Sequence, residues 1–157
     1  MSEKIFHIQS WTPQIQETAQ NLIHEICGVA PELEVLFMGA AALGLPGKND
    51  IDLDILCNQD DISSYTQKLL PVLGKPRNAD GRLSIWEFKY QDFDIDAILS
   101  DPSVSHVPEQ RRAFEKLRDD QSLLDEYRQL KVACDGLSYA TYEKRKAAFF
   151  IERVLGE

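Results

Sequence analysis

The chain has 157 residues and a mass of 17.9 kDa, a length that suits one domain with a sizeable core. Its hydrophobic content of 43%, with 7 Phe, 5 Tyr and 2 Trp, excludes a disordered chain. The formal net charge of −9 disfavours a broad surface for polyanions, so long DNA or RNA is not expected as a partner.

The first predicted element is a helix over residues 13–26. Thr12 can cap it, Pro13 suits its first position, and apolar residues then recur at helical spacing. Gly28 and Pro31 mark its end, because both residue types disfavour a continuing helix.

A segment that contains several glycines lies between the next two predicted elements, which are strands. The strands cover residues 34–38 and 50–57, and residues 40–43 can form a short helical turn between them. A second helix is predicted over residues 62–70, after which Pro71 begins a polar link.

The second half of the chain predicts a hairpin followed by helices. Residues 83–90 and 93–99 alternate between apolar and polar side chains across a two-residue polar break, as in an antiparallel hairpin. The remainder is predicted to be helical, at 109–118, 122–134 and 139–155. This order of elements predicts an α+β protein with a mixed or antiparallel sheet packed by helices.

The three cysteines, Cys27, Cys57 and Cys134, are widely spaced in apolar surroundings, which indicates reduced thiols rather than disulfides or a zinc site. No apolar run approaches the roughly 18 residues of a membrane span, and the polar N-terminal stretch lacks the apolar centre of a signal peptide. We therefore expect a cytoplasmic protein without a membrane partner.

Three aspartates occupy alternate positions of the strand predicted over residues 50–57. Asp50, Asp52 and Asp54 would share one face of this strand, while the apolar residues between them share the other. Aspartate is a poor strand former, so three in this pattern need a reason beyond contact with solvent.

The strand predicted over residues 93–99 repeats the pattern with Asp94 and Asp96. If the two acidic strands are neighbours, their carboxylates converge and repel one another unless a cation neutralises them. Oxygen ligands of this kind suit Mg²⁺. The alternative is an ordinary solvent-facing side of an edge strand, where apolar and polar residues also alternate.

The acidic strands and the loop before the first of them resemble the nucleotidyltransferase fold of DNA polymerase beta and the aminoglycoside nucleotidyltransferases. The shared pattern is a glycine and a small residue after an apolar strand, then D-x-D among hydrophobic residues, then a carboxylate on a later strand. The segment GAAALGLPGKNDIDL is similar to the GrpB-like (UPF0157) branch, and Tyr127, Tyr142, Lys146 and the apolar run 149–155 resemble its closing helices.

This resemblance implies a single nucleotidyltransferase-like domain at 1–157, with an α/β catalytic core at 1–101 and C-terminal helices at 102–157. It also implies an enzyme that uses one or two Mg²⁺ ions. The reaction would transfer a nucleoside monophosphate from a nucleoside triphosphate to a hydroxyl or amine of a small-molecule acceptor. The resemblance implies no particular acceptor, nucleotide preference or oligomeric state.

The same resemblance assigns roles to the five aspartates, all of which are candidate metal ligands. It favours Asp50 and Asp52 as the catalytic pair, although Asp52 and Asp54 fit the looser spacing equally well. Asp96 is preferred as the third catalytic carboxylate, to bind metal or to take the proton of the acceptor, and Asp94 is the alternative.

Five further residues are candidates for binding the nucleotide: Gly39, Ala40, Lys48, Lys131 and Lys146. The lysines would contact phosphates, and the alternative for each of them is a solvated surface amine.

Three departures from the family pattern make binding competence and catalytic competence separate questions, and the first of them favours an alternative function, a catalytically inactive nucleotide- or metal-binding module with the same fold. Ala40 replaces the usual serine and its hydroxyl, although backbone N–H groups at a following helix start can also bind an anion. Asp94 and Asp96 stand where GrpB-like proteins tend to carry histidines, which brings the chain closer to metal-binding transferases. Ala113 and Phe114 replace a Phe-Arg pair.

Overall fold

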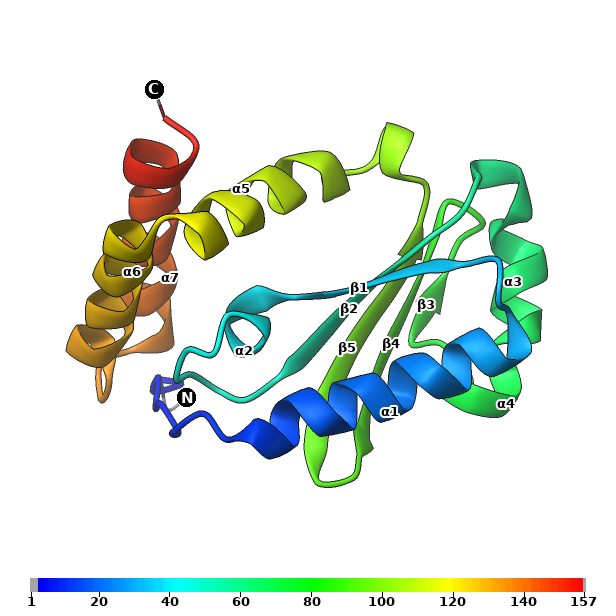
Figure 1. Cartoon of the computed structure of the whole chain (residues 1–157), viewed down its shortest axis with the longest axis horizontal. Coiled ribbons are helices and arrows are strands. Elements are labelled where there is room, and N and C mark those ends of the chain that lie inside the picture. Colours follow the sequence, from blue (N-terminus) through cyan, green and yellow to red (C-terminus); the bar gives the residue numbers. More distant parts are fainter. Residues whose placement is uncertain (1–2, 157) are drawn as a thin grey trace.

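The computed structural model describes residues 3–156 (Figure 1). Its elements, in chain order, are α1 (Pro13–Val29), β1 (Glu34–Met38), α2 (Gly39–Ala42), β2 (Ile51–Leu56), η1 (Gln59–Asp61), α3 (Ile62–Lys68), α4 (Leu70–Leu73), β3 (Asn78–Ala79), β4 (Leu83–Tyr90), β5 (Phe93–Ser100), η2 (Pro102–Val104), α5 (Val107–Asp119), α6 (Gln121–Cys134), α7 (Tyr139–Phe149) and η3 (Phe150–Val154).

The five strands form one mixed sheet in the order β1-β2-β5-β4-β3. β2 and β5 are parallel neighbours, while the other pairs are antiparallel. The predicted hairpin is confirmed as β4 and β5. Its two turn residues, Gln91 and Asp92, have φ values of 49° and 72°, which suit the tight turns that join antiparallel strands.

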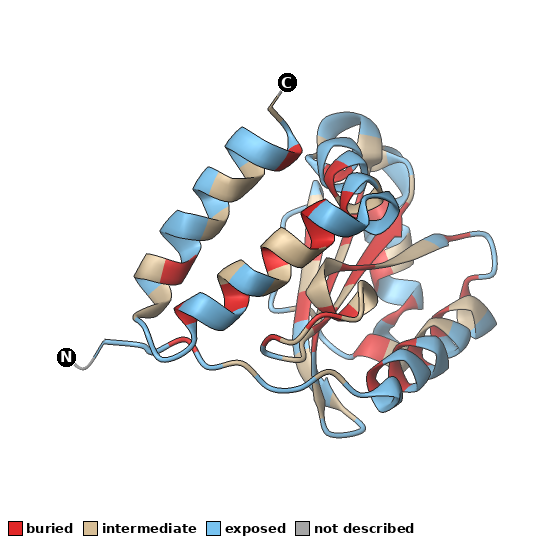
Figure 2. Ribbon diagram, turned by 60° about the vertical axis from the view of Figure 1, so that its left-hand side comes forward, coloured by how far each residue is buried: buried red, intermediate tan, exposed pale blue. Residues whose placement is uncertain are grey.

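One face of the sheet packs against α1, α3 and α4. The apolar residues of β2 and β5 that alternate with the aspartates belong to this core, together with Trp86 of β4 and the apolar stripe of α1. Figure 2 shows buried residues concentrated on the strands and on the inward sides of the helices. The period of two in the strands therefore leaves the aspartates on the other face.

The C-terminal helices form a second, smaller core at the opposite end of the molecule from α3 and α4, and α5 leads to them from the sheet (Figure 1). The turns between these helices are closed by side-chain caps. Asp120 accepts from the N–H of Leu123 at the start of α6, and Ser138 accepts from the N–H of Thr141 at the start of α7.

The segment before α1 joins the C-terminal helices to the loop between α2 and β2. The N–H of Phe6 donates to the carbonyl of Leu137, and Gln9 and Gly47 exchange backbone hydrogen bonds. The ring of Phe6 stacks on Tyr142 with centroids 3.7 Å apart. This segment therefore helps to hold the helices against the sheet.

The structure differs from the expected elements after Pro71 and in the last helix. The polar link expected after Pro71 contains the rest of α4 and the short strand β3, which pairs with β4. The last helix, expected over residues 139–155, changes at Phe150 into the π-helical turn η3.

Within residues 3–156, none of the helices has the length and apolarity that a membrane crossing requires.

Candidate functional site

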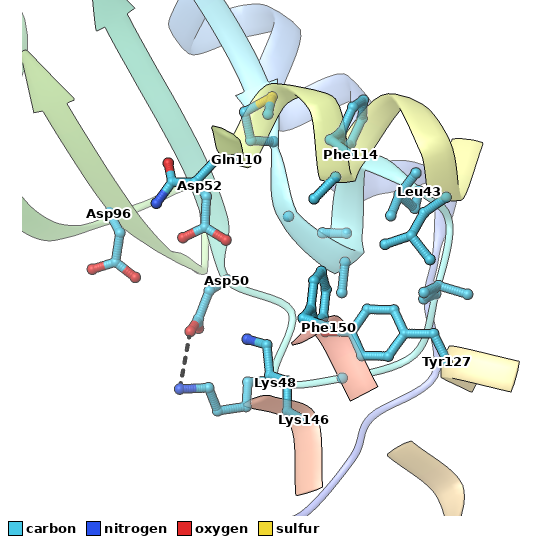
Figure 3. A pocket seen from close by; sticks show the side chains of 18 of the residues that line it. Leu43, Lys48, Asp50, Asp52, Asp96, Gln110, Phe114, Tyr127, Lys146 and Phe150 are labelled. Atoms are coloured by element: carbon cyan, nitrogen blue, oxygen red, sulfur yellow. Dashed lines mark ion pairs between the residues drawn. The ribbon is translucent and has the colours of Figure 1, made fainter. Parts of the chain in front are cut away.

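Asp52 and Asp96 lie opposite each other on neighbouring strands. The parallel register pairs Asp52 of β2 with Asp96 of β5, and alternation places both side chains on the sheet face away from α1. Asp50 directly precedes β2, and all three line the same cavity (Figure 3). We call Asp50, Asp52 and Asp96 the carboxylate set.

The other two predicted metal ligands, Asp54 and Asp94, flank this set. Asp54 is only 9% exposed, and burial raises its pKa. Asp94 lies at the start of β5, next to the hairpin turn, where its side chain is 61% exposed and forms an ion pair with Lys89 at 3.2 Å. It lines a neighbouring shallow hollow rather than the cavity around Asp52.

The carboxylate set carries more negative charge than its surroundings neutralise. Burial, followed by the charges of Asp96 and Asp50, raises the pKa of Asp52 to about 7. Burial and the charge of Asp50 also raise the pKa of Asp96. A bound cation would relieve this repulsion.

The donor chemistry of the carboxylate set fits Mg²⁺, because it consists of carboxylate oxygens. Within the described part of the chain, however, no three His, Cys, Asp or Glu side chains are grouped so that they could hold a metal ion. Asp50 points instead to Lys48, whose Nζ lies 3.4 Å from its Oδ2 (Figure 3). Asp50 would have to leave Lys48 to join Asp52 and Asp96 around a metal.

Gly39 brings the backbone close to the carboxylate set. It has a φ of +82° at the junction of β1 and α2, a backbone conformation that favours glycine. A Cβ at this position would overlap the Oδ2 of Asp52. Ala40 follows it and lines the cavity. The predicted glycine and small residue therefore lie next to the acidic strand.

Lys131 is a buried cation at the same cavity, with 4% of its surface exposed. Its Nζ donates a hydrogen bond to the Tyr142 hydroxyl at 2.9 Å and lies 5.8, 5.0 and 5.2 Å from the ring centroids of Phe6, Tyr127 and Tyr142. Among residues 3–156, no carboxylate forms an ion pair with it. Burial and the neighbouring lysines lower its pKa to about 8.

Lys48 and Lys146 line the cavity beside Lys131. Lys48 donates a hydrogen bond to the Tyr139 hydroxyl at 2.9 Å. Burial acts to lower the pKa of Lys48, but this hydrogen bond and the charge of Asp50 outweigh it and raise the pKa. Lys146 lies 5.9 Å from the ring centroid of Tyr142. The three predicted lysines, which we call the lysine group, are thus brought together from different parts of the chain.

The cavity has a volume of about 640 Å³ and two unlike ends. The polar end holds the carboxylate set with Lys48 and Lys146 (Figure 3), while the Nζ of Lys131 lies 5.0 Å from the ring centroid of Tyr127. The apolar end is lined by Leu43, Phe114 and Phe150, which come from the end of α2, from α5 and from η3 (Figure 3).

Sequence reasoning did not assign the aromatic side chains that line this cavity to the site. Phe6 is remote in sequence from the other lining residues, and Phe114 was noted only as a departure from the family pattern. Tyr139, Tyr142 and Lys146 recur at spacings of three and four residues, which places them on one side of α7. This helical spacing is the sequence feature that could have indicated that the three side chains lie together.

Comparison with known proteins finds similarity in sequence and in fold. No family model matches the chain. A UPF0157 protein of Vibrio cholerae serotype O1 is 27% identical over 154 residues, which cover 92% of this chain and 79% of the relative.

Two solved structures are similar in fold. One is Cid1, described as having RNA terminal uridylyl transferase activity, with a TM-score of 0.52 and 17% identity over 74% of this chain. The other is a cytoplasmic RNA terminal U-transferase, with a TM-score of 0.50 and 18% identity over 74% of this chain. The matched region spans 40% and 38% of the lengths of these two structures.

The chain therefore has an α+β, nucleotidyltransferase-like fold, as its sequence pattern predicted. It is similar to a UPF0157 protein, in agreement with the branch that the loop and acidic strand resemble.

Proposed function

We propose that this chain is a Mg²⁺-dependent nucleotidyltransferase that transfers a nucleoside monophosphate from a nucleoside triphosphate to a small-molecule acceptor. The observation that carries this proposal is the register of β2 and β5. It sets Asp52 opposite Asp96, beside Gly39, in the cavity that also holds the lysine group. Negative side chains for a metal and positive side chains for phosphates thus share one cavity.

The lysine group would bind the phosphates of the nucleotide. Lys131 has the largest role, because its buried ammonium has no carboxylate partner among the described residues, and a phosphate would supply the missing charge. Lys48 links the lysine group to the carboxylate set, because it forms an ion pair with Asp50. It also donates a hydrogen bond to the Tyr139 hydroxyl. Release of Asp50 as Lys48 turns to a phosphate would free that carboxylate for a metal.

The carboxylate set, with Asp50 directly before β2, Asp52 in β2 and Asp96 in β5, would hold Mg²⁺. The bound ion would neutralise charge on the phosphates and orient them for in-line displacement. Asp96 would either hold the metal beside the acceptor or take the proton from the acceptor hydroxyl or amine directly. The acceptor oxygen or nitrogen bonds to the α-phosphorus, the bond between the α- and β-phosphates breaks, and pyrophosphate leaves.

A small acceptor agrees better with the charge of this chain than a nucleic acid does. The net charge of the chain is −9. A negative charge of this size disfavours the approach of an RNA strand, whose phosphates are also negative. The related transferase structures are described as acting on RNA ends, so an RNA oligonucleotide belongs in the test as a competing acceptor.

An alternative is a module that binds the nucleotide without turnover. Ala40 favours it, because a methyl group lies where a serine hydroxyl would contact a phosphate. The ion pair between Lys48 and Asp50 also favours it, since it withdraws one carboxylate from the metal.

Calorimetric titration tests the binding step. The four nucleoside triphosphates are titrated with and without MgCl₂ into the parent, into Asp52→Asn, and into Asp92→Asn as a control in the exposed hairpin turn. We expect binding that needs Mg²⁺ and is lost only in Asp52→Asn. Equal binding by Asp52→Asn and the parent would refute the metal assignment.

Pyrophosphate release then separates the enzyme from the binding module. The parent is assayed with ATP and Mg²⁺ against amines, sugars, amino acids and a short RNA. Release that depends on a small acceptor supports the proposal, release with RNA alone refutes the acceptor class, and affinity without turnover on any acceptor favours the binding module.

A further inference from the structure

We infer that the apolar end of the cavity is a stacking site for the nucleobase and that it selects purine over pyrimidine nucleotides. This inference rests on the proposed function, and it extends it by naming the class of nucleotide. Its basis is the division of the cavity into a charged end and an aromatic end.

A nucleoside triphosphate is divided in the same way. Its phosphates carry the charge at one end, and its base presents flat apolar faces at the other. With the phosphates on the lysine group, the base would extend to the side chains of Phe114 and Phe150 (Figure 3). The charged phosphates would then lie at the charged end of the cavity, and the apolar faces of the base would lie at the apolar end.

Phe150 is held in place by its aromatic neighbours. Its ring is perpendicular to those of Tyr127 and Phe149, at 86° in both cases, with centroids 5.3 and 5.7 Å away. Such contacts hold a ring in one orientation before a ligand arrives. Phe150 remains half-buried and lines the cavity, so part of its surface faces the space that a base would fill.

Phe114 faces the same cavity from α5. It is half-buried, and no aromatic ring within residues 3–156 pairs with it. A planar ligand would supply that partner. Because α5 and η3 pack against each other, the two phenylalanines belong to elements whose relative position is fixed.

The apolar end itself offers little for reading the edge of a base, although His106, Glu109 and Gln110 line the cavity elsewhere, around the start of α5. Among the four labelled there in Figure 3, which are Leu43, Phe114, Tyr127 and Phe150, only Tyr127 carries a hydrogen-bonding group. Discrimination would therefore depend on the stacked area, which is larger for a two-ring base than for a one-ring base.

Titration calorimetry with Mg²⁺ tests this inference on the parent, Phe114→Leu and Phe150→Leu. Leucine keeps the apolar volume and removes the flat ring. Phe93→Leu, a half-buried phenylalanine of β5 outside the cavity, is the matched control. Thermal melts confirm that each variant is folded. The probes are ATP, GTP, CTP, UTP and inorganic tripolyphosphate.

We expect the parent to bind ATP and GTP about tenfold more tightly than CTP and UTP, and each cavity variant to lose most of that ratio while Phe93→Leu keeps it. Equal binding of purine and pyrimidine nucleotides by the parent, or a ratio that survives in both cavity variants, would overturn the inference and leave nucleotide binding intact. Failure of both tripolyphosphate and all four nucleotides to bind would instead refute the proposed function.

Discussion

Gly39 lies directly against the carboxylate of Asp52, so that a Cβ on the glycine would overlap the aspartate Oδ2. This contact joins the loop after β1 to the centre of the carboxylate set. It depends on a backbone conformation, with φ at +82°, that other residues rarely adopt. The position of Asp52 is therefore sensitive to a single methyl group.

Gly39→Ala should destabilise the fold and displace Asp52. Gly44→Ala is a matched control, because Gly44 has a similar φ of +75° but open space around its Cβ position. We expect both variants to lose about 1 kcal/mol from backbone strain, and Gly39→Ala to lose about 1–2 kcal/mol more from the overlap. Urea unfolding measures the stabilities. Similar losses in both variants, with Mg²⁺–ATP binding intact in Gly39→Ala, would contradict the importance of this contact.

Asp52→Asn should make the protein more stable at alkaline pH. The pKa of Asp52 rises from 3.8 to about 7 on folding, so the fold favours the protonated form. That stabilisation is complete below pH 4 and is lost as the pH rises to 7. We expect the variant to gain about 1–2 kcal/mol at pH 8 and to show a smaller fall in stability between pH 5 and pH 8. Parallel pH profiles for the two proteins would argue against a strained carboxylate.

Lys131→Met should weaken phosphate binding without lowering the stability of the fold. The pKa of Lys131 falls to about 8 on folding, so the buried charge costs stability below pH 8 and the cost is relieved as the pH rises toward 10.5. Methionine keeps much of the side chain without the charge. At pH 7 we expect unchanged or higher stability, by up to about 1 kcal/mol, and at least about tenfold weaker binding of tripolyphosphate.

Lys144 is an exposed residue of α7, and Lys144→Met is the matched control for the loss of one positive charge. Denaturation measures stability and calorimetry measures binding in both variants. If Lys131→Met and Lys144→Met weaken tripolyphosphate binding equally, Lys131 acts only through the general field of the protein.

Ala40→Ser should introduce the hydroxyl that the GrpB-like pattern carries at this position. Ala40 lines the cavity next to Gly39, and a hydroxyl there could donate to a phosphate oxygen. We expect about fivefold tighter binding of Mg²⁺–ATP and faster pyrophosphate release. Ala42→Ser, on the same short helix but not lining the cavity, should change neither quantity. Identical behaviour of the two serine variants would show that the missing hydroxyl is unimportant.

The sequence alone was sufficient for much of the local structure. Apolar and acidic residues alternate in β2 and β5, and this period of two determines which side chains face the core and which face the cavity. The same kind of pattern placed the hairpin of β4 and β5, whose turn at Gln91 and Asp92 is short and polar. These features depend on residues close together in the chain, so they can be read without knowledge of the fold.

Only the tertiary structure decided which strands are neighbours and what lines the cavity. The pairing of β2 with β5 joins segments some forty residues apart, and it places Asp52 opposite Asp96 while Asp94 stays in solvent with Lys89. The burial of Lys131 depends on Phe6, which reaches α7 from the other end of the chain. Strand partners and buried neighbours result from packing between distant segments, and periodicity within one segment carries no information about that packing.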